Sequence, residues 1–168
     1  TGNNGGDGFV AANVLVARGH TVQVFVFGER ARIQGDARSA LATLERTGGA
    51  EIFAAEDAKA LLLFAAMLAE AELAVDALFG TGLRSDVRGL MADAIELLNR
   101  AQAAKVAVDL PSGIDADTGA VRGCAVIADA TVTFAFAKRG HYLFPGAEHR
   151  GSLTVVDIGI PHRLATET

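Results

Sequence analysis

The chain has 168 residues, 51% of them hydrophobic, and a formal net charge of −5 at pH 7. This length and composition suit one folded domain, so we expect residues 1–168 to form a single domain. The sequence contains no Lys/Arg cluster, which argues against a nucleic-acid partner or an anionic membrane. The longest apolar stretch is too short for a membrane span. A single cysteine excludes an internal disulfide and favours a reducing compartment such as the cytoplasm.

Helix and strand patterns alternate along the chain. In chain order they predict a helix over 9–20, a strand over 21–27, a helix over 36–49, a short strand over 51–53, a helix over 56–71, a strand over 72–79, a helix over 86–104, and strands over 105–110, 130–137 and 152–160. Long helices between strands imply parallel crossover units. Several strands lack in/out alternation, as expected when helices cover both faces of the sheet. We therefore predict a three-layer α/β/α domain, doubly wound around a mostly parallel, Rossmann-like sheet.

Ligands in such folds bind at the carboxyl ends of the strands. Three segments place unusual residues there: residues 3–8, Asp76 with the following 80–82, and Asp109 with the following 111–113. If the fold prediction is right, these three segments converge on one edge of the sheet.

The first of these segments contains Asn3, Asn4, Gly5, Gly6, Asp7 and Gly8. We expect a loop whose glycines let backbone N–H groups approach a phosphate at the N-terminus of the next helix. The Asn side chains add carbonyl oxygens that could contact a cation or a polar substrate group. The alternative is a tight turn in which Asp7 merely caps the helix.

Asp76 and Asp109 each occur in an otherwise apolar strand, where an unpaired carboxylate is costly. With Ser112 and the two Asn residues they form an oxygen-rich set of the kind that hard cations prefer. No His or Cys neighbours these segments, so zinc is not expected. The alternative for either Asp is a structural carboxylate that accepts backbone N–H bonds.

Ser112 lacks the G-x-S-x-G context of a nucleophile, so a ligand or loop-closing hydroxyl is the better interpretation. Lys138 follows a strand and could face the same edge, although a solvated lysine explains it equally well. His141 and His149 receive no role from the sequence.

Five ordered segments together resemble the YjeF N-terminal domain family: GNNGGDGFVAA, DALFGTGL, VAVDLPSGIDADTG, ADATVTFAFAKRG and GSLTVVDIGIP. The resemblance implies an NAD(P)H-hydrate epimerase, which interconverts the R and S forms of hydrated NADH and NADPH. It also implies a dehydratase partner, as a fused domain or a separate protein, and a possible homodimer. Family members usually carry N-terminal helices and a first strand ahead of the glycine segment. We therefore expect this chain to be a fragment whose sheet lacks that strand.

The resemblance also carries site residues onto this sequence. It implies one K⁺ per subunit, held by Asn4, Asp76 and Ser112. From the chemistry of the implied reaction we hypothesise that Asp109 is the acid/base group and that Lys138 holds or polarises the leaving oxygen. The implied substrate contacts are Asn3, Asn4, Gly5, Gly6, Asp7, Gly80, Thr81, Gly82, Leu83, Arg84, Ser85, Asp86 and Asp109.

Two other functions remain open from the sequence. One is a non-catalytic nucleotide-binding or protein-interaction module of the same fold, which would be expected to lose residues such as Asn4 and Asp109. The other is a redox enzyme that uses an intact nicotinamide cofactor. Against the redox enzyme, the glycine pattern is not G-x-G-x-x-G, and only Glu29 is placed to bind a ribose.

Overall fold

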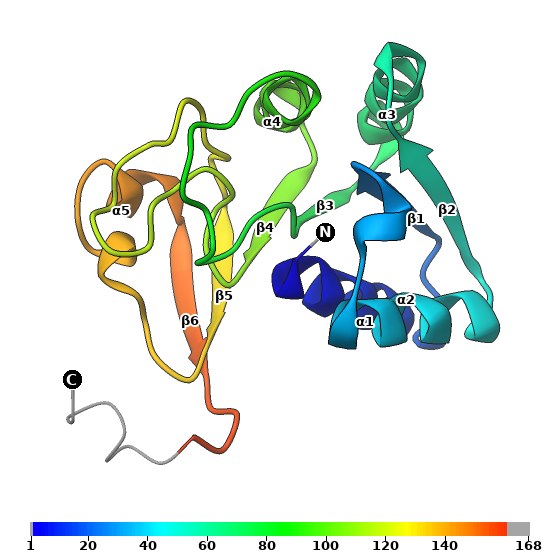
Figure 1. The fold of residues 1–168 in the computed structure, drawn as a ribbon, viewed down its shortest axis with the longest axis horizontal. Coiled ribbons are helices and arrows are strands. Elements are labelled where there is room, and N and C mark those ends of the chain that lie inside the picture. The colour runs from blue at the N-terminus through cyan, green and yellow to red at the C-terminus, as the bar shows by residue number, and fades with distance from the viewer. Residues whose placement is uncertain (1, 161–168) are drawn as a thin grey trace.

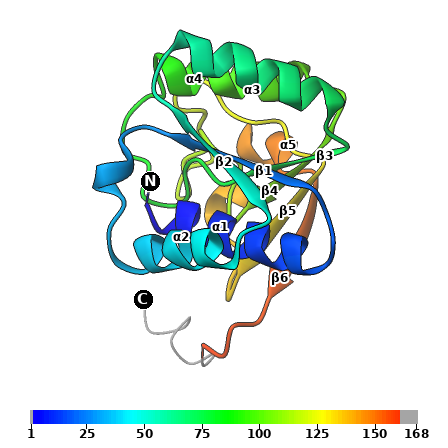
Figure 2. The same cartoon turned by 90° about the vertical axis from the view of Figure 1, so that its right-hand side faces the viewer.

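The computed structural model describes residues 2–160 and shows a three-layer α/β arrangement (Figures 1 and 2). Its elements are α1 (Asn3–Ala17), β1 (Val22–Phe27), the 3₁₀ helix η1 (Arg30–Arg32), α2 (Gly35–Thr47), β2 (Ala50–Ala55), α3 (Ala58–Glu70), β3 (Leu73–Asp76), α4 (Leu90–Arg100), β4 (Ala104–Val108), β5 (Ala130–Phe134), the 3₁₀ helix η2 (Arg139–His141), α5 (Gly146–His149) and β6 (Ser152–Val156). Figure 2 shows α1 and α2 on one side of the strands and α3 and α4 on the other. The predicted doubly wound fold is confirmed.

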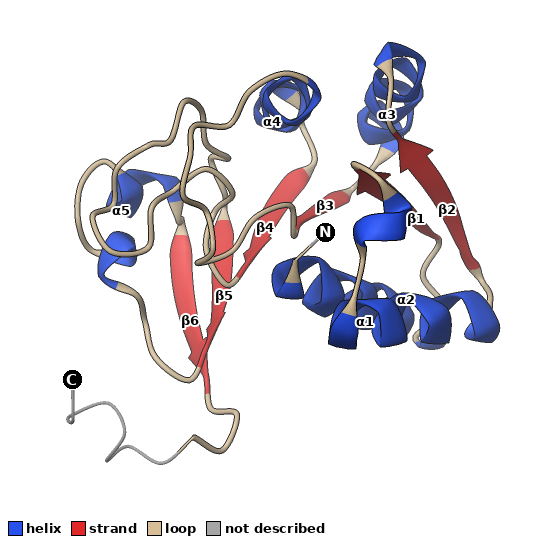
Figure 3. Cartoon of the chain, in the orientation of Figure 1, coloured by secondary structure: helices blue, strands red, loops and turns tan. Residues whose placement is uncertain are grey.

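Every strand pairing is parallel, but the strands form two groups. β1 pairs with β2, and β3, β4, β5 and β6 follow one another in a four-stranded sheet (Figure 3). A cavity of about 880 Å³ lies between the two groups and is lined by β1, β3, α1 and α3. The edges of β1 and β3 that face this cavity are not paired with another strand among the described residues.

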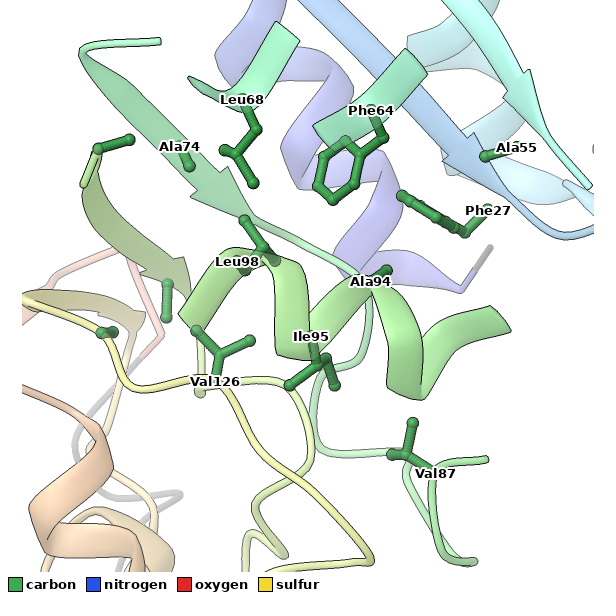
Figure 4. Close-up of a cluster of buried hydrophobic side chains, with 13 residues drawn as sticks. Phe27, Ala55, Phe64, Leu68, Ala74, Val87, Ala94, Ile95, Leu98 and Val126 are labelled. Atoms are coloured by element: carbon green, nitrogen blue, oxygen red, sulfur yellow. The ribbon is translucent and has the colours of Figure 1, made fainter. Parts of the chain in front are cut away.

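The main core lies between the strands and helices α3 and α4 (Figure 4). Phe64 of α3 packs edge-on against Phe27 of β1, with ring centroids 5.3 Å apart. Leu68 of α3 and Ile95 and Leu98 of α4 belong to the same buried cluster. A second cluster joins α1 and α2 to β1 through Phe9, Leu41 and Leu44. These contacts fix α1 and the strand ends relative to one another.

The prediction that residues 3–8 form a loop is wrong, because α1 begins at Asn3 and contains all of them. Glycines in a helix interior are unfavourable by about 1 kcal/mol each, but tertiary contacts here require them. A Cβ on Gly6 would lie 2.9 Å from Ala37 Cα, and one on Gly8 would lie 2.7 Å from Ala77 Cβ. The glycines therefore let α1 pack closely on α2 and on the segment after β3.

Other predicted elements are confirmed with shifted ends. The strand predicted over 72–79 ends at Asp76, the helix predicted over 86–104 covers only α4, and the last two strands end at Phe134 and Val156. The residues beyond these strand ends lie in loops, and β4, which ends at Val108, leaves Asp109 in a loop at the carboxyl edge of the sheet. Among the described residues, no helix is long and apolar enough to cross a membrane.

Candidate active site

Asp76 and Ser112 join the ends of β3 and β4. Ser112 donates from its backbone N–H to Asp76 Oδ2 at 2.8 Å and from Oγ to Asp76 Oδ1 at 2.5 Å. Ser112 Oγ also accepts the N–H of Phe79 at 2.9 Å. Asp76 is 2% exposed and Ser112 is fully buried. Burial raises the pKa of Asp76, and the hydrogen bonds from Ser112 and Leu78 oppose that rise.

Asn4, in the first turn of α1, lies against the same segment. A Cβ on Gly80 would lie 3.2 Å from Asn4 Cγ and 3.4 Å from Asn4 Oδ1, so a side chain at this position would crowd Asn4. The Asn4 side chain is buried, and neither its Oδ1 nor its Nδ2 has a hydrogen-bond partner. Such orphaned polar atoms are rare in folded proteins and mark a place for an ion or water. The Asp76 carboxylate and the Ser112 hydroxyl are oxygen donors of the kind that hard cations prefer, and the Asn4 amide oxygen is a donor of the same kind.

Asp109 follows β4 in a strained backbone conformation. Its φ is 68°, a left-handed value that only a few per cent of non-glycine residues adopt. The N–H of Leu110 donates to the Val108 carbonyl at 2.8 Å, which closes a γ-turn around Asp109. Ala135, after β5, repeats the arrangement, with φ 61° and a 2.7 Å bond from Phe136 N–H to the Phe134 carbonyl. Strain of this kind concentrates at functional sites.

The Asp109 side chain is one member of a compact polar cluster. Its Oδ1 accepts the Thr133 hydroxyl at 2.9 Å and forms an ion pair with Lys138 Nζ. Lys138 Nζ also donates to Thr133 Oγ1 at 2.8 Å. The register pairs Val108 with Val132, so the next residue on each strand, Asp109 and Thr133, lies beside the other. Lys138 is therefore not a freely solvated lysine, and it does face this edge.

Asp7 lies in α1, close to Asp109. Partial burial and, secondly, the negative charge of Asp109 raise the pKa of Asp7. The Asp7 side chain does not cap the helix, because Gly2 occupies the N-cap position and no side chain bonds there. The predicted convergence of three segments thus occurs: α1 meets the segment after β3 through Asn4 and the segment after β4 through Asp7.

The second predicted substrate segment, residues 80–86, is less closely tied to this cluster. Leu83 packs on the main core. Thr81, Gly82, Arg84, Ser85 and Asp86 are exposed. Arg84 Nη1 donates to the Thr81 carbonyl at 3.1 Å and so folds the loop onto itself. These residues form an exposed rim that begins at Gly80, beside Asn4.

Two members of the cluster were not predicted from the sequence. Thr133 could have been noticed, because Thr131 and Thr133 are polar residues at alternating positions of an apolar strand and both are fully buried. His141 carried no signal, because its place depends on the 3₁₀ helix η2 after Lys138. Within residues 2–160, no three His, Cys, Asp or Glu side chains gather as a metal-binding group.

The family model described as YjeF-related protein N-terminus matches residues 1–140. The chain is 43% identical to the NAD(P)H-hydrate epimerase of Levilactobacillus brevis, covering 95% of this chain and 70% of the relative. It is 45% identical to the bifunctional NAD(P)H-hydrate repair enzyme Nnr of Moorella thermoacetica and 50% identical to that of Pyrobaculum aerophilum. The chain spans about a third of the length of these bifunctional relatives, with coverages of 31% and 32%.

Among solved structures, the fold is similar to that of the yeast protein titled ynu0, YNL200c. The TM-score is 0.77 at 23% identity, covering 99% of this chain and 67% of the yeast chain. At this level of identity the likeness supports the fold alone.

Proposed function

The chain belongs to the family of YjeF-related protein N-termini, and from this premise we propose that it is an NAD(P)H-hydrate epimerase, an isomerase. The observation that carries the proposal is the Asp109–Lys138 ion pair at the carboxyl edge of the sheet, with Asp109 15% and Lys138 23% exposed on their side chains. A paired acid and base that remain partly accessible can exchange a proton with a bound molecule. The relatives named above supply the substrate class, the hydrated forms of NADH and NADPH.

The chemistry inverts a ring carbon that carries a hydroxyl beside the ring nitrogen. The nitrogen lone pair expels the hydroxyl, and the carbon–oxygen bond breaks. The leaving oxygen is held by Lys138, takes a proton from the Asp109–Lys138 pair through Asp109, and departs as water. The planar iminium carries a positive charge that the Asp109 carboxylate stabilises. Water then adds to the opposite face, and its proton returns to the Asp109–Lys138 pair. The enzyme ends in its initial protonation state, and only the configuration of the carbon has changed.

The site residues of α1 and the loop after β3 would bind the rest of the substrate. The free N–H groups at the start of α1 and the positive end of its dipole favour a phosphate or pyrophosphate. The exposed rim of residues 80–86 would contact the same dinucleotide. These assignments, a dehydratase partner, a homodimer and a cytoplasmic location stay predictions.

Asn4, Asp76 and Ser112 would hold one K⁺ per subunit. The support is the orphaned Asn4 side chain next to a buried carboxylate and hydroxyl. When bound, the ion would fix the loops and orient the pyrophosphate. In the absence of substrate, KCl should raise the melting temperature of the wild type above its value in choline chloride, and Asn4→Ala should remove the difference. Equal melting temperatures in both salts would contradict the K⁺ assignment.

The test of the activity is the Asp109→Asn variant. We expect epimer interconversion to slow by about 10²–10⁴-fold, the usual contribution of a general acid or base, while the affinity for the hydrated cofactor changes little. Asp93→Asn, an exposed carboxylate in the first turn of α4, is the matched control. A wild type that binds the hydrate without interconverting it would instead support the binding module. Oxidation of intact NADPH to NADP⁺ in the presence of a hydride acceptor would instead support the redox enzyme.

A further inference from the structure

His141 is fully buried and its ring joins two segments of the active site. The backbone N–H of Lys138 donates to Nδ1 at 2.9 Å, and Nε2 lies 2.9 Å from the carbonyl oxygen of Asp109. A backbone N–H can only donate, so Nδ1 must be the unprotonated nitrogen. Nε2 then carries the hydrogen and donates to Asp109. One neutral imidazole therefore bonds to the backbones of both members of the ion pair.

We propose that His141 is a positioning residue that holds the Asp109 carboxylate and the Lys138 ammonium in their reactive orientation. The inference rests on the proposed function, since it concerns the same acid/base pair. His141 does not touch the substrate in this proposal. It acts through the Asp109 carbonyl and the Lys138 amide.

The strained turn explains why a positioning group is needed. Asp109 has a left-handed φ inside a γ-turn, and the orientation of this turn decides where the Asp109 carboxylate points. The bond from Nε2–H fixes the carbonyl of that turn in one direction. Thr133 and Lys138 fix the carboxylate itself, so both ends of Asp109 are held.

His141 is itself anchored by its surroundings. Arg150 Nε donates to the His141 carbonyl at 2.7 Å, and Gly140 N–H donates to the Ala116 carbonyl at 2.7 Å. Burial is the largest cause and lowers the pKa of the imidazole. The hydrogen bond to the Asp109 carbonyl and the Asp109 charge raise the pKa, and the charges of Lys138 and Arg150 lower it. Protonation of Nδ1 would also break the bond from Lys138. The ring therefore stays neutral and keeps both hydrogen bonds at physiological pH.

The experiment compares two substitutions of His141 by steady-state epimerisation, at a temperature well below each melting point. His141→Phe keeps an aromatic ring but removes both hydrogen bonds. His141→Gln keeps a donor that can reach the Asp109 carbonyl. His149→Phe is the matched control, because His149 makes one ring bond to a backbone carbonyl, that of Val126, outside the cluster.

We expect His141→Phe to lower kcat by about 10²-fold, as misplacement of a reacting group by about 1 Å can do, with KM nearly unchanged. His141→Gln should recover most of kcat, and His149→Phe should leave it unaltered. A folded His141→Phe with the kcat of the wild type, or a His141→Gln no better than His141→Phe, would overturn the proposal.

A second measurement keeps the proposal testable if His141→Phe fails to fold. Long-range ¹H–¹⁵N spectra of the wild type at about pH 7.5 should show His141 as the neutral Nε2–H tautomer. A ring that is protonated on both nitrogens at this pH, or that carries its only proton on Nδ1, would exclude the bridge. A wild type without epimerase activity would refute the proposed function, whereas the spectra test the bridge independently of it.

Discussion

Replacement of Ser112 by Ala should destabilise the domain, because its buried hydroxyl makes two hydrogen bonds. Ser112 Oγ donates to the buried Asp76 Oδ1 at 2.5 Å and accepts the N–H of the partly buried Phe79 at 2.9 Å. Alanine fits the space but removes both bonds. It leaves the buried Asp76 carboxylate short of one donor and the Phe79 N–H without this acceptor.

The size of the loss follows from these two bonds. A hydrogen bond to a charged group contributes about 1.5–3 kcal/mol, and an unsatisfied buried donor costs about 1–3 kcal/mol. The Ser112 N–H still bonds to Asp76 Oδ2, so part of the connection survives. We expect a loss of about 3 kcal/mol in the free energy of unfolding. For a domain of this size that corresponds to a fall of roughly 6–12 °C in melting temperature.

Urea unfolding followed by circular dichroism at pH 7 measures the effect, with the slope m as a check that the same surface unfolds. Ser152→Ala is the matched control: its hydroxyl makes one exposed bond of 3.3 Å to the Asp129 carbonyl. That variant should stay within about 0.5 kcal/mol of the wild type. A loss below about 1 kcal/mol for Ser112→Ala would mean that Ser112 does not join the ends of β3 and β4 as described.

Two further predictions concern acid stability and the cavity between the strand groups. The hydrogen bond from Arg122 is the first of several that hold the pKa of Asp115 well below its ordinary value of 3.8. The ionised Asp115 carboxylate therefore stabilises the folded state fully above pH 3.8, and this stabilisation is lost as the pH falls below that value. Asp115→Asn should remove this part of the pH dependence of the free energy of urea unfolding. The same pH dependence in Asp115→Asn and the wild type would contradict the prediction. In hydrogen exchange, the N–H groups of β1 and β3 that point into the cavity should exchange on the order of 10³-fold faster than those of β4, which is paired on both sides. Equal protection would show that these edges are covered in solution.

The sequence predicts the sheet and the place of its acids because both depend on local patterns. Apolar β-branched runs that end in Asp76 and Asp109 read as strands, and parallel strands bring their carboxyl ends to one edge. The meeting of Asp76 with Ser112 follows from that topology, since β3 and β4 are neighbours.

The rest depends on contacts that a single sequence does not reveal. Helix propensity places Gly5, Gly6 and Gly8 in a loop, but all three lie inside α1, where Gly6 packs closely on Ala37 and Gly8 on Ala77. Likewise, nothing local marks His141, whose position depends on η2 folding back beneath Asp109. Tertiary contacts of this kind override propensity, and they occur here at the site itself.

The two halves of the site differ in their access to solvent. Asp76 and Ser112 are buried, at 2% and 0% exposure. Asp109 and Lys138 keep 15% and 23% of their side chains exposed, with Asp7 beside them. A molecule of dinucleotide size can therefore meet the protein at Asp109 but not at Asp76. Substitutions at Asp76 should then act on stability and, on the proposed assignment, on ion binding, whereas those at Asp109 should act on turnover, even though only two residues, Leu110 and Pro111, lie between Asp109 and Ser112.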